Sequence, residues 1–250
     1  MSPEARALQP IDHDGISWLG DERARSHGAA VWFHDRVGGT SDAPFDTLNL
    51  AYSVGDDRDH VSENRARVAR VGGWSVSALA LAKQVHGADV VEVDEGSAAP
   101  VGFADVLVAR RQGVVIGILS ADCVPVALAG ERGVAMVHAG WRGLVAGAIE
   151  AGIDALGPVR GAWVGPAIRS CCYEVKEDVI DSFRASGLPV AGPDRVDPSD
   201  AAVFSLVRAG VEDVSATDVC TSCDERYFSY RRDGLTGRQG SFITIVEGAR

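Results

Sequence analysis

The sequence predicts an α/β (α+β) fold, a single-domain layered sandwich in which helices flank a mixed β-sheet. Short apolar runs rich in β-branched residues alternate along the chain with segments of helical periodicity. Between residues 76 and 137 the runs follow one another without a helix, which favours antiparallel pairing within the same architecture. The chain of 250 residues, 46% of them hydrophobic, is long enough to bury one sizeable core.

The expected strands are runs of β-branched and other apolar residues that are bounded by Gly, Pro or Asp. Because such runs carry few polar positions, they are typical of strands buried on both faces. They lie at residues 90–93, 106–108, 114–119, 124–128 and 134–137.

The expected helices are three segments whose apolar residues recur at helical spacing. The segment 61–71 places them among Arg and Glu, and the segment 141–156 is rich in Ala with a face of small residues. The segment 200–209 starts at Asp200, whose carboxylate is a natural N-cap for the apolar run that follows. Strands and helices thus interleave, as the fold class requires.

The chain divides into a leader and one larger unit. Residues 1–30 alternate charged residues with Pro and Gly, so we expect a polar leader with peripheral structure and little chemistry. Residues 31–250 hold no internal repeat, low-complexity stretch or Ser/Gly linker. We therefore expect residues 31–250 to form a single catalytic domain.

Charge and hydropathy limit the partners that the protein can have. The 24 Lys and Arg residues against 35 Asp and Glu residues give a net charge of −11, which repels nucleic acid and anionic lipid. No run approaches the roughly 18 apolar residues of a membrane span, and residues 1–30 lack the apolar core of a secretory signal. We expect a cytoplasmic protein with a small-molecule substrate.

The five cysteines are an odd number and too sparse for a secreted disulfide scaffold, which points to a reducing compartment. Cys220 and Cys223 form a single CxxC pair. A four-cysteine zinc site would need Cys171 and Cys172 as the other ligands, and adjacent cysteines seldom chelate one metal well. We therefore expect Cys220 and Cys223 to be a passive or mildly redox-active pair.

Three residues with metal-binding side chains, His86, Cys123 and His138, stand at the ends of apolar runs. Side chains at strand ends can converge on one mouth of a sheet. Two imidazoles and one thiolate form a zinc-binding set that leaves a fourth position open, as in catalytic sites. The alternative is that both histidines satisfy buried backbone groups while Cys123 packs as a small hydrophobe.

Several motifs carry a resemblance to one known family. The main strings are Gln-Val-His-Gly at 84–87, Ala-Asp-Cys-Val-Pro-Val at 121–126, His-Ala-Gly-Trp-Arg-Gly-Leu at 138–144 and Gly-Pro-Ala-Ile through Cys-Cys-Tyr-Glu-Val within 165–175. Shorter matches lie at 33–41, 48–50, 54–57, 64–65, 228–234 and 236–238. From about residue 31 to the C-terminus, the chain closely resembles the bacterial polyphenol-oxidase-like (laccase-like) purine nucleoside phosphorylases. At 34–35, His-Asp stands where that family more often has small hydroxyl residues.

The resemblance implies an activity and a cofactor. It implies a zinc ion, with copper as a possible substitute, held by His86, Cys123 and His138. It also implies phosphorolysis of adenosine, inosine and S-methyl-5'-thioadenosine to a free base and a pentose 1-phosphate, with adenosine deaminase as a side activity. The partners would be a purine nucleoside and phosphate, the protein a monomer or homodimer, and the fold similar to that of the toxin deamidases.

Further residues are candidates for catalysis and substrate binding. Arg36, beside a Gly-Gly pair, and Arg142, at an apparent helix start, are candidates for holding phosphate, and a surface ion pair is an equal alternative for each. Gln84 and Asn49 carry amides that can read a purine or ribose edge, although a turn role is favoured for Asn49. Asp122 is a candidate for orienting a histidine or moving a proton.

Two other functions use the same residues. Cys123 activated by His138 would be the nucleophile of an amidase or deamidase, and a zinc ion that only stabilises the fold would suit a non-enzymatic adaptor. A true multicopper oxidase is rejected, because six histidines, His13 and His27 among them in the leader, and two methionines cannot build a blue-copper site and a His-rich cluster.

Overall fold

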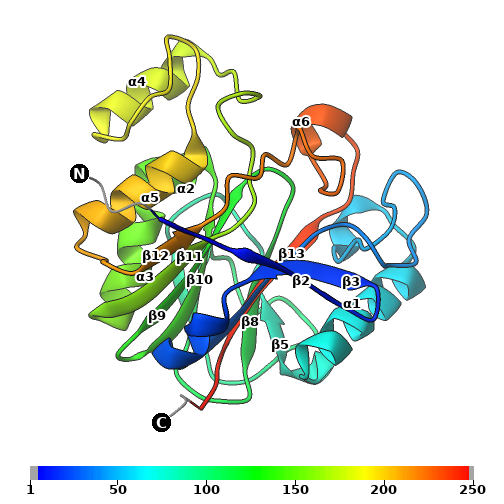
Figure 1. Ribbon diagram of the computed structural model, residues 1–250. Coiled ribbons are helices and arrows are strands. Elements are labelled where there is room, and N and C mark those ends of the chain that lie inside the picture. Colours follow the sequence, from blue (N-terminus) through cyan, green and yellow to red (C-terminus); the bar gives the residue numbers. More distant parts are fainter. Residues whose placement is uncertain (1–4, 248–250) are drawn as a thin grey trace.

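Two mixed β-sheets packed face to face form the centre of the computed structural model, which describes residues 5–247 (Figure 1). The seven-stranded sheet has the order β1-β12-β11-β9-β10-β7-β6, and the six-stranded sheet has the order β2-β3-β4-β13-β8-β5. The first sheet comprises β1 (Arg6–Ala7), β12 (Val214–Ala216), β11 (Val159–Val164), β9 (Val124–Gly130), β10 (Gly133–Ala139), β7 (Val106–Ala109) and β6 (Val90–Val93). The second comprises β2 (Gln9–His13), β3 (Ile16–Gly20), β4 (Ala29–His34), β13 (Gln239–Ile245), β8 (Val115–Ser120) and β5 (Leu79–Leu81).

Helices cover the outer faces of the two sheets (Figure 1). Helices α2 (Trp141–Ala146), α3 (Ala148–Leu156), α4 (Glu177–Ala185) and α5 (Pro198–Arg208) lie on the seven-stranded sheet, and α1 (Arg58–Gly72) lies on the six-stranded sheet. The short helix α6 (Tyr230–Asp233) and the 3-10 helices η1 (Glu22–His27), η2 (Tyr52–Val54) and η3 (Val76–Ala78) complete the described elements. None of the helices within residues 5–247 combines the length and the apolar character needed to traverse a bilayer.

The alternation of side chains along the strands produces the layers. In β9, Val126 and Leu128 pack with the helices, whereas Ala127 and Ala129 face the six-stranded sheet. Because both faces of this strand are covered, every residue of β9 is buried. This double coverage explains the continuous apolar runs in the sequence.

The expected fold class is confirmed, and all five predicted strands are present as β6 to β10. The segment 141–156 is divided into α2 and α3, because Gly147 between them has a left-handed φ of 83°. The third helix begins at Pro198 with Asp197 as its N-cap, so the prediction that Asp200 is the cap was wrong. The Asp197 side chain accepts from the backbone N–H of Asp200.

Residues 5–30 differ from the peripheral leader expected for residues 1–30, of which residues 1–4 lie outside the described part of the chain. Within this segment, β1 pairs with β12 of one sheet, and β3 pairs with β4 of the other. Ile16 and Leu19 are buried in the apolar clusters around the six-stranded sheet. The polar composition concealed these short strands because their neighbours in the sheets, rather than their own sequence, supply the pairing.

Strand order brings the predicted metal-binding residues together at one edge of the seven-stranded sheet, where the ends of β6, β7, β9 and β10 lie side by side. The antiparallel pairing of β10 with β9 puts His138 opposite Pro125, two residues after Cys123. The pairing of β10 with β7 puts Val137 opposite Val106, which directly follows Asp105. Strand β6 runs parallel to β7, so the loop before β6, which contains His86, reaches the same edge.

Candidate active site

Two histidines and one cysteine meet at this edge. One possible ligand atom from each of His86, Cys123 and His138 lies within 4.8 Å of the others. The rings of His86 and His138 have centroids 4.9 Å apart and are inclined at 76°. His138 is buried, Cys123 is half-buried and His86 is exposed, so the cluster opens to solvent on one side. The predicted convergence of these three side chains is therefore found in the structure.

Asp105 holds both histidines in place. Its side chain is 0% exposed, and one carboxylate oxygen lies 2.7 Å from Nδ1 of His138. The same carboxylate accepts the backbone N–H groups of Val85, His86 and Gly87 at 3.1, 3.0 and 2.7 Å. These bonds stabilise the positive φ of 62° at His86. Because Nδ1 of His138 is engaged by Asp105, its Nε2 is the nitrogen left for a ligand.

Charge within the cluster favours a thiolate. Burial by itself raises the pKa of Cys123, but the positive charge and hydrogen bonds of His138 and His86 outweigh it and lower this pKa to about 6. Burial likewise lowers the pKa of His138, but the Cys123 thiolate and the Asp105 carboxylate raise it to about 9. The donor set is thus two imidazoles and one readily ionised thiol, which fits a divalent metal of intermediate softness.

The cluster lies in a broad pocket of about 1420 Å³. The pocket is rich in cations, which oppose the net charge of −11 of the whole chain. Its cationic lining residues are Arg58, Arg65, Lys83, Arg142, Arg231 and Arg238. Its aromatic lining residues are Tyr52, Trp141, Tyr173 and Tyr230. Cations and planar rings beside a metal-binding cluster suit an anionic co-substrate and a flat ligand.

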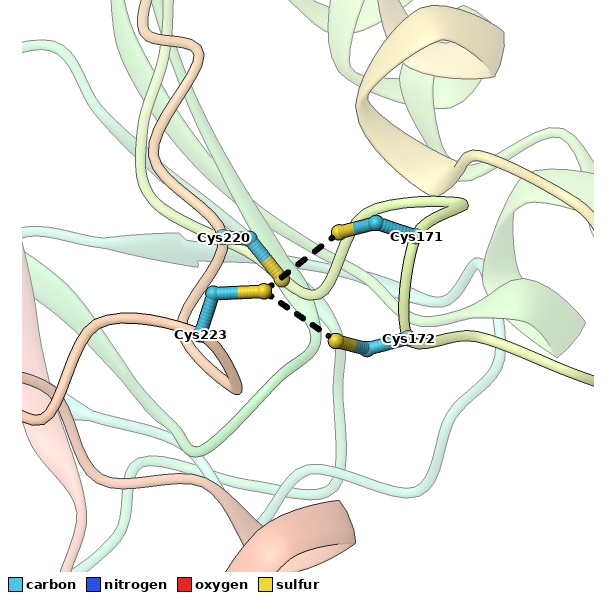
Figure 2. Close-up of side chains that lie close together, drawn as sticks. All are labelled: Cys171, Cys172, Cys220 and Cys223. Atoms are coloured by element: carbon cyan, nitrogen blue, oxygen red, sulfur yellow. Dashed lines mark hydrogen bonds between the residues drawn. The ribbon is translucent and has the colours of Figure 1, made fainter.

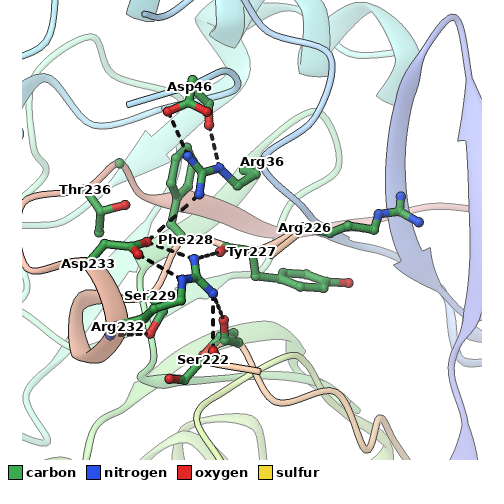
Figure 3. Close-up of polar contacts among 12 residues, drawn as sticks. Arg36, Asp46, Ser222, Arg226, Tyr227, Phe228, Ser229, Arg232, Asp233 and Thr236 are labelled. Atoms are coloured by element: carbon green, nitrogen blue, oxygen red, sulfur yellow. Dashed lines mark hydrogen bonds and ion pairs between the residues drawn. The ribbon is translucent and has the colours of Figure 1, made fainter. Parts of the chain in front are cut away.

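Arg142 and Arg36 lie in different cavities. The exposed Arg142 lines the pocket of the cluster, and its guanidinium stands 4.4 Å from the centre of the Trp141 ring. Arg36 lines a separate cavity of about 470 Å³, which contains none of the three clustered residues. Its guanidinium pairs with Asp46 at 2.9 Å and lies over the Phe228 ring at 4.6 Å (Figure 3). The ion-pair alternative therefore describes Arg36.

The amides of Gln84 and Asn49 are already hydrogen-bonded to protein groups, most of them backbone. Gln84 donates to the carbonyl of Leu119 at 2.9 Å and accepts the N–H of Leu119 at 3.0 Å. Asn49 is 0% exposed, and its oxygen accepts the N–H groups of Ala51 and Arg238 at 3.1 and 2.9 Å. Both residues hold the pocket wall together, and the turn role favoured for Asn49 describes its contacts.

Asp122 does not contact a histidine. Its two carboxylate oxygens accept from the Thr221 hydroxyl and from the Arg231 backbone N–H, both at 2.7 Å. The orienting carboxylate is Asp105 instead, which the sequence analysis missed. The available signal was an acidic residue directly before a fully apolar strand, β7. Sequence reasoning also left Arg65, Lys83 and Arg238 unassigned, although the structure brings all three into the pocket.

Comparisons with known proteins agree on one family. A family model described as multi-copper polyphenol oxidoreductase laccase matches residues 30–246. The chain is 38% identical over 232 residues to purine nucleoside phosphorylase YfiH of Shigella flexneri, covering 88% of this chain and 95% of the relative. It is 35% identical over 264 residues to purine nucleoside phosphorylase YlmD of Geobacillus stearothermophilus, covering 93% of this chain and 96% of the relative.

Solved structures show the same fold. The crystal structure of YlmD from Geobacillus stearothermophilus superimposes with a TM-score of 0.87 at 32% identity, covering 97% of this chain and 100% of the other. The Bacillus licheniformis hypothetical protein YfiH gives a TM-score of 0.84 at 28% identity, covering 94% and 97% of the two chains. On the match over residues 30–246, the chain belongs to the multi-copper polyphenol oxidoreductase laccase family.

Proposed function

We propose that this protein is a zinc-dependent purine nucleoside phosphorylase. The observation that carries the proposal is the meeting of His86, Cys123 and His138 within 4.8 Å in a pocket lined by cations and aromatic rings. The names of the curated relatives, purine nucleoside phosphorylase in each case cited above, support the reaction class. The pocket draws residues from Ala51 to Arg238, which supports the expected single catalytic domain, and strands β1 to β3 add residues before residue 31 to it.

Zinc is our choice of metal because three protein donors of this type leave one coordination position open. The remaining histidines offer no second cluster, since the only metal-binding groups found within residues 5–247 are this one and a set of four cysteines. His27 contacts Asp213, and His34 is buried between Trp18 and Phe242. These positions argue against multicopper chemistry. When bound, zinc supplies a Lewis acid beside the substrate.

The substrates we propose are adenosine, inosine and S-methyl-5'-thioadenosine, together with phosphate. In phosphorolysis a phosphate oxygen bonds to C1′ of the sugar while the bond from C1′ to the purine nitrogen breaks. The departing purine carries the electron pair and takes up a proton. Arg142, Arg231 and Arg238 would neutralise the phosphate, while Tyr173 and Trp141 would stack on the purine. We extend the proposal to adenosine deamination as a side activity of the same pocket.

Asp105 and three residues predicted from the sequence, Asp122, Gln84 and Asn49, position the groups that line the pocket. Asp105 fixes the two histidines, and Asp122 holds the Arg231 backbone against the pocket. Gln84 and Asn49 fix the backbone of the wall. These are positioning roles, because each polar side-chain atom described is already paired with protein.

A second function is favoured by one observation. The pKa of Cys123, lowered to about 6 despite burial, and that of His138, raised to about 9, match a nucleophilic thiolate beside an imidazolium. A Cys-His amidase would use this pair without a metal. Alkylation by iodoacetamide discriminates, since a thiolate that binds zinc resists the reagent until a chelator is added. A zinc-stabilised adaptor is disfavoured, because structural zinc is normally closed by four protein ligands.

The decisive experiment is chromatography of products from zinc-loaded protein and adenosine, with and without inorganic phosphate. We expect adenine and ribose 1-phosphate only when phosphate is present, and inosine in either case from deamination. Cys123→Ser should abolish both products, whereas Arg36→Ala, outside the pocket, should retain phosphorolysis. The proposal would be contradicted if adenine were released equally with and without phosphate. It would also be contradicted if adenosine, inosine and S-methyl-5'-thioadenosine all gave no product.

A further inference from the structure

Four of the five cysteines lie together in a group that does not include Cys123 (Figure 2). Their four sulfur atoms all lie within 4.8 Å of one another, and they belong to Cys171, Cys172, Cys220 and Cys223. The Cys223 sulfur stands 3.6 Å from that of Cys171 and 3.2 Å from that of Cys172. Cys220 and Cys223 were expected from the sequence to be a passive or mildly redox-active pair, and in the structure Cys171 and Cys172 lie beside them.

We propose that these four cysteines bind one zinc ion, in a closed structural site distinct from the cluster of His86, Cys123 and His138. Four thiolates are a complete ligand set for structural zinc. In a tetrahedron with zinc-sulfur bonds of about 2.3 Å, neighbouring sulfurs are about 3.8 Å apart. The sulfur distances of 3.6 and 3.2 Å are close to this edge and far from the roughly 2.05 Å of a disulfide.

The backbone explains how two adjacent cysteines can serve one ion. Residues 169–172 form a tight turn, in which the N–H groups of Cys172 and Tyr173 both donate to the Arg169 carbonyl at 2.9 Å. This turn brings the sulfurs of Cys171 and Cys172 to the same side, facing Cys223 (Figure 2). The objection that adjacent cysteines chelate poorly applies to extended chain, where successive side chains point to opposite faces.

Residues 220–224 form a second tight turn, which faces the first. The N–H groups of Cys223 and Asp224 donate to the Cys220 carbonyl at 3.1 and 3.0 Å. The backbone N–H of Arg169 donates to the Cys220 sulfur at 3.4 Å. An amide directed at a cysteine sulfur stabilises the thiolate form that a metal requires, and this amide comes from the opposite turn.

Two arginines hold the turns in place by binding their carbonyl groups. Arg195 donates to the carbonyls of Ser170 and Cys171, both at 3.0 Å. Arg232 donates to the Thr221 carbonyl at 2.9 Å. The ligands are therefore positioned by contacts that do not involve the metal, and the exposed Cys171 and Cys223 leave a path for the ion to enter.

The site would brace the wall of the catalytic pocket. Thr221, between the two cysteines of the CxxC turn, donates to the carboxylate of Asp122, the neighbour of Cys123. Tyr173, which follows Cys172, lines the pocket. An ion joining the two turns would fix both contacts. None of the four thiols belongs to the cluster of His86, Cys123 and His138, so metal binding by them does not depend on the proposed phosphorylase activity.

The test is the zinc content of the reduced, full-length protein after reconstitution with zinc and gel filtration, measured by mass spectrometry of the metal. We expect two ions per chain in the wild type, one in Cys223→Ser and one in Cys123→Ser. Cobalt gives a second readout, because a four-thiolate site produces strong sulfur-to-cobalt charge-transfer absorption. That absorption should persist in Cys123→Ser and, in Cys223→Ser, fall to the weaker absorption expected from the single Cys123 thiolate.

A conservative variant guards against misfolding as an explanation. Cys223→His keeps a zinc ligand at the same position and should retain two ions per chain. Circular dichroism of each variant reports whether it has folded. The proposal is overturned if Cys223→Ser keeps two ions, or if the wild type binds only one ion and Cys123→Ser binds none. It is also overturned if the reduced wild type forms a disulfide among these cysteines in the presence of zinc.

Discussion

Replacing Asp105 with asparagine tests how the buried carboxylate supports the candidate metal centre. One of its oxygens accepts from His138 and from the His86 backbone, and the other accepts from the backbone of Val85 and Gly87. Asparagine keeps the shape but replaces one acceptor oxygen with an NH2 group. In one orientation that group would face the N–H donors of Val85 and Gly87, and in the other the His86 N–H and Nδ1 of His138, so up to two hydrogen bonds are lost.

The expected loss follows from these contacts. Hydrogen bonds to a charged acceptor contribute roughly 1.5–3 kcal/mol each, so two of them give about 3–6 kcal/mol of the free energy of unfolding. The Asp105 side chain is 0% exposed, so water cannot replace the missing partners. Metal affinity should also fall by about 10- to 100-fold, because His138 loses the partner that fixes its tautomer.

Two measurements check the prediction: urea unfolding of the metal-free protein and zinc titration against a chelating dye. Asp89→Asn is the matched control, since Asp89 is exposed, its backbone carbonyl accepts the N–H of Asp105, and the substitution removes the same charge. It should leave both quantities within error of the wild type. An Asp105→Asn variant that unfolds at the same urea concentration as the wild type and binds zinc equally well would contradict the role assigned to Asp105.

Three further predictions concern other parts of the molecule. Burial lowers the pKa of His34 to about 3, so the neutral ring costs the folded protein nothing above about pH 6.5, and stability declines below that pH as the unfolded chain takes up a proton. In urea unfolding, the free energy of unfolding of the wild type should fall by about 2 kcal/mol between about pH 7 and pH 5 through this residue, and His34→Leu should lack that part of the decrease. Arg142→Ala should raise the KM for phosphate at least about tenfold, whereas Arg36→Ala should not, as steady-state kinetics would reveal. Gly165→Ala should cost about 1–3 kcal/mol by thermal or urea unfolding, because its Cβ would overlap the ring of Phe33; an unchanged midpoint would contradict that overlap.

Much of the fold could be predicted because it depends on local pattern. The strands β6 to β10 are continuous apolar runs of β-branched residues, and this composition specifies a strand buried on both faces wherever it lies in a sheet. The break between α2 and α3 depends on the left-handed φ of one residue, Gly147. The sequence did not predict this break, because a glycine in an Ala-rich run can adopt either a helical or a left-handed φ. The short N-terminal strands were hidden because pairing partners more than 190 residues away stabilise β1.

In the candidate site, too, some features follow from local sequence and others from contacts between distant residues. The sequence determined the identity of the donor set, because His86, Cys123 and His138 are the kinds of side chain that bind a metal and each follows an apolar run. Only the tertiary structure decided which carboxylate serves them, which arginine shares their pocket and which cysteines meet. Those choices follow from strand order and register, which bring residues such as Cys172 and Cys223 to 3.2 Å across 51 positions of chain. No local pattern encodes such distances, since they are set by the packing of the whole sandwich.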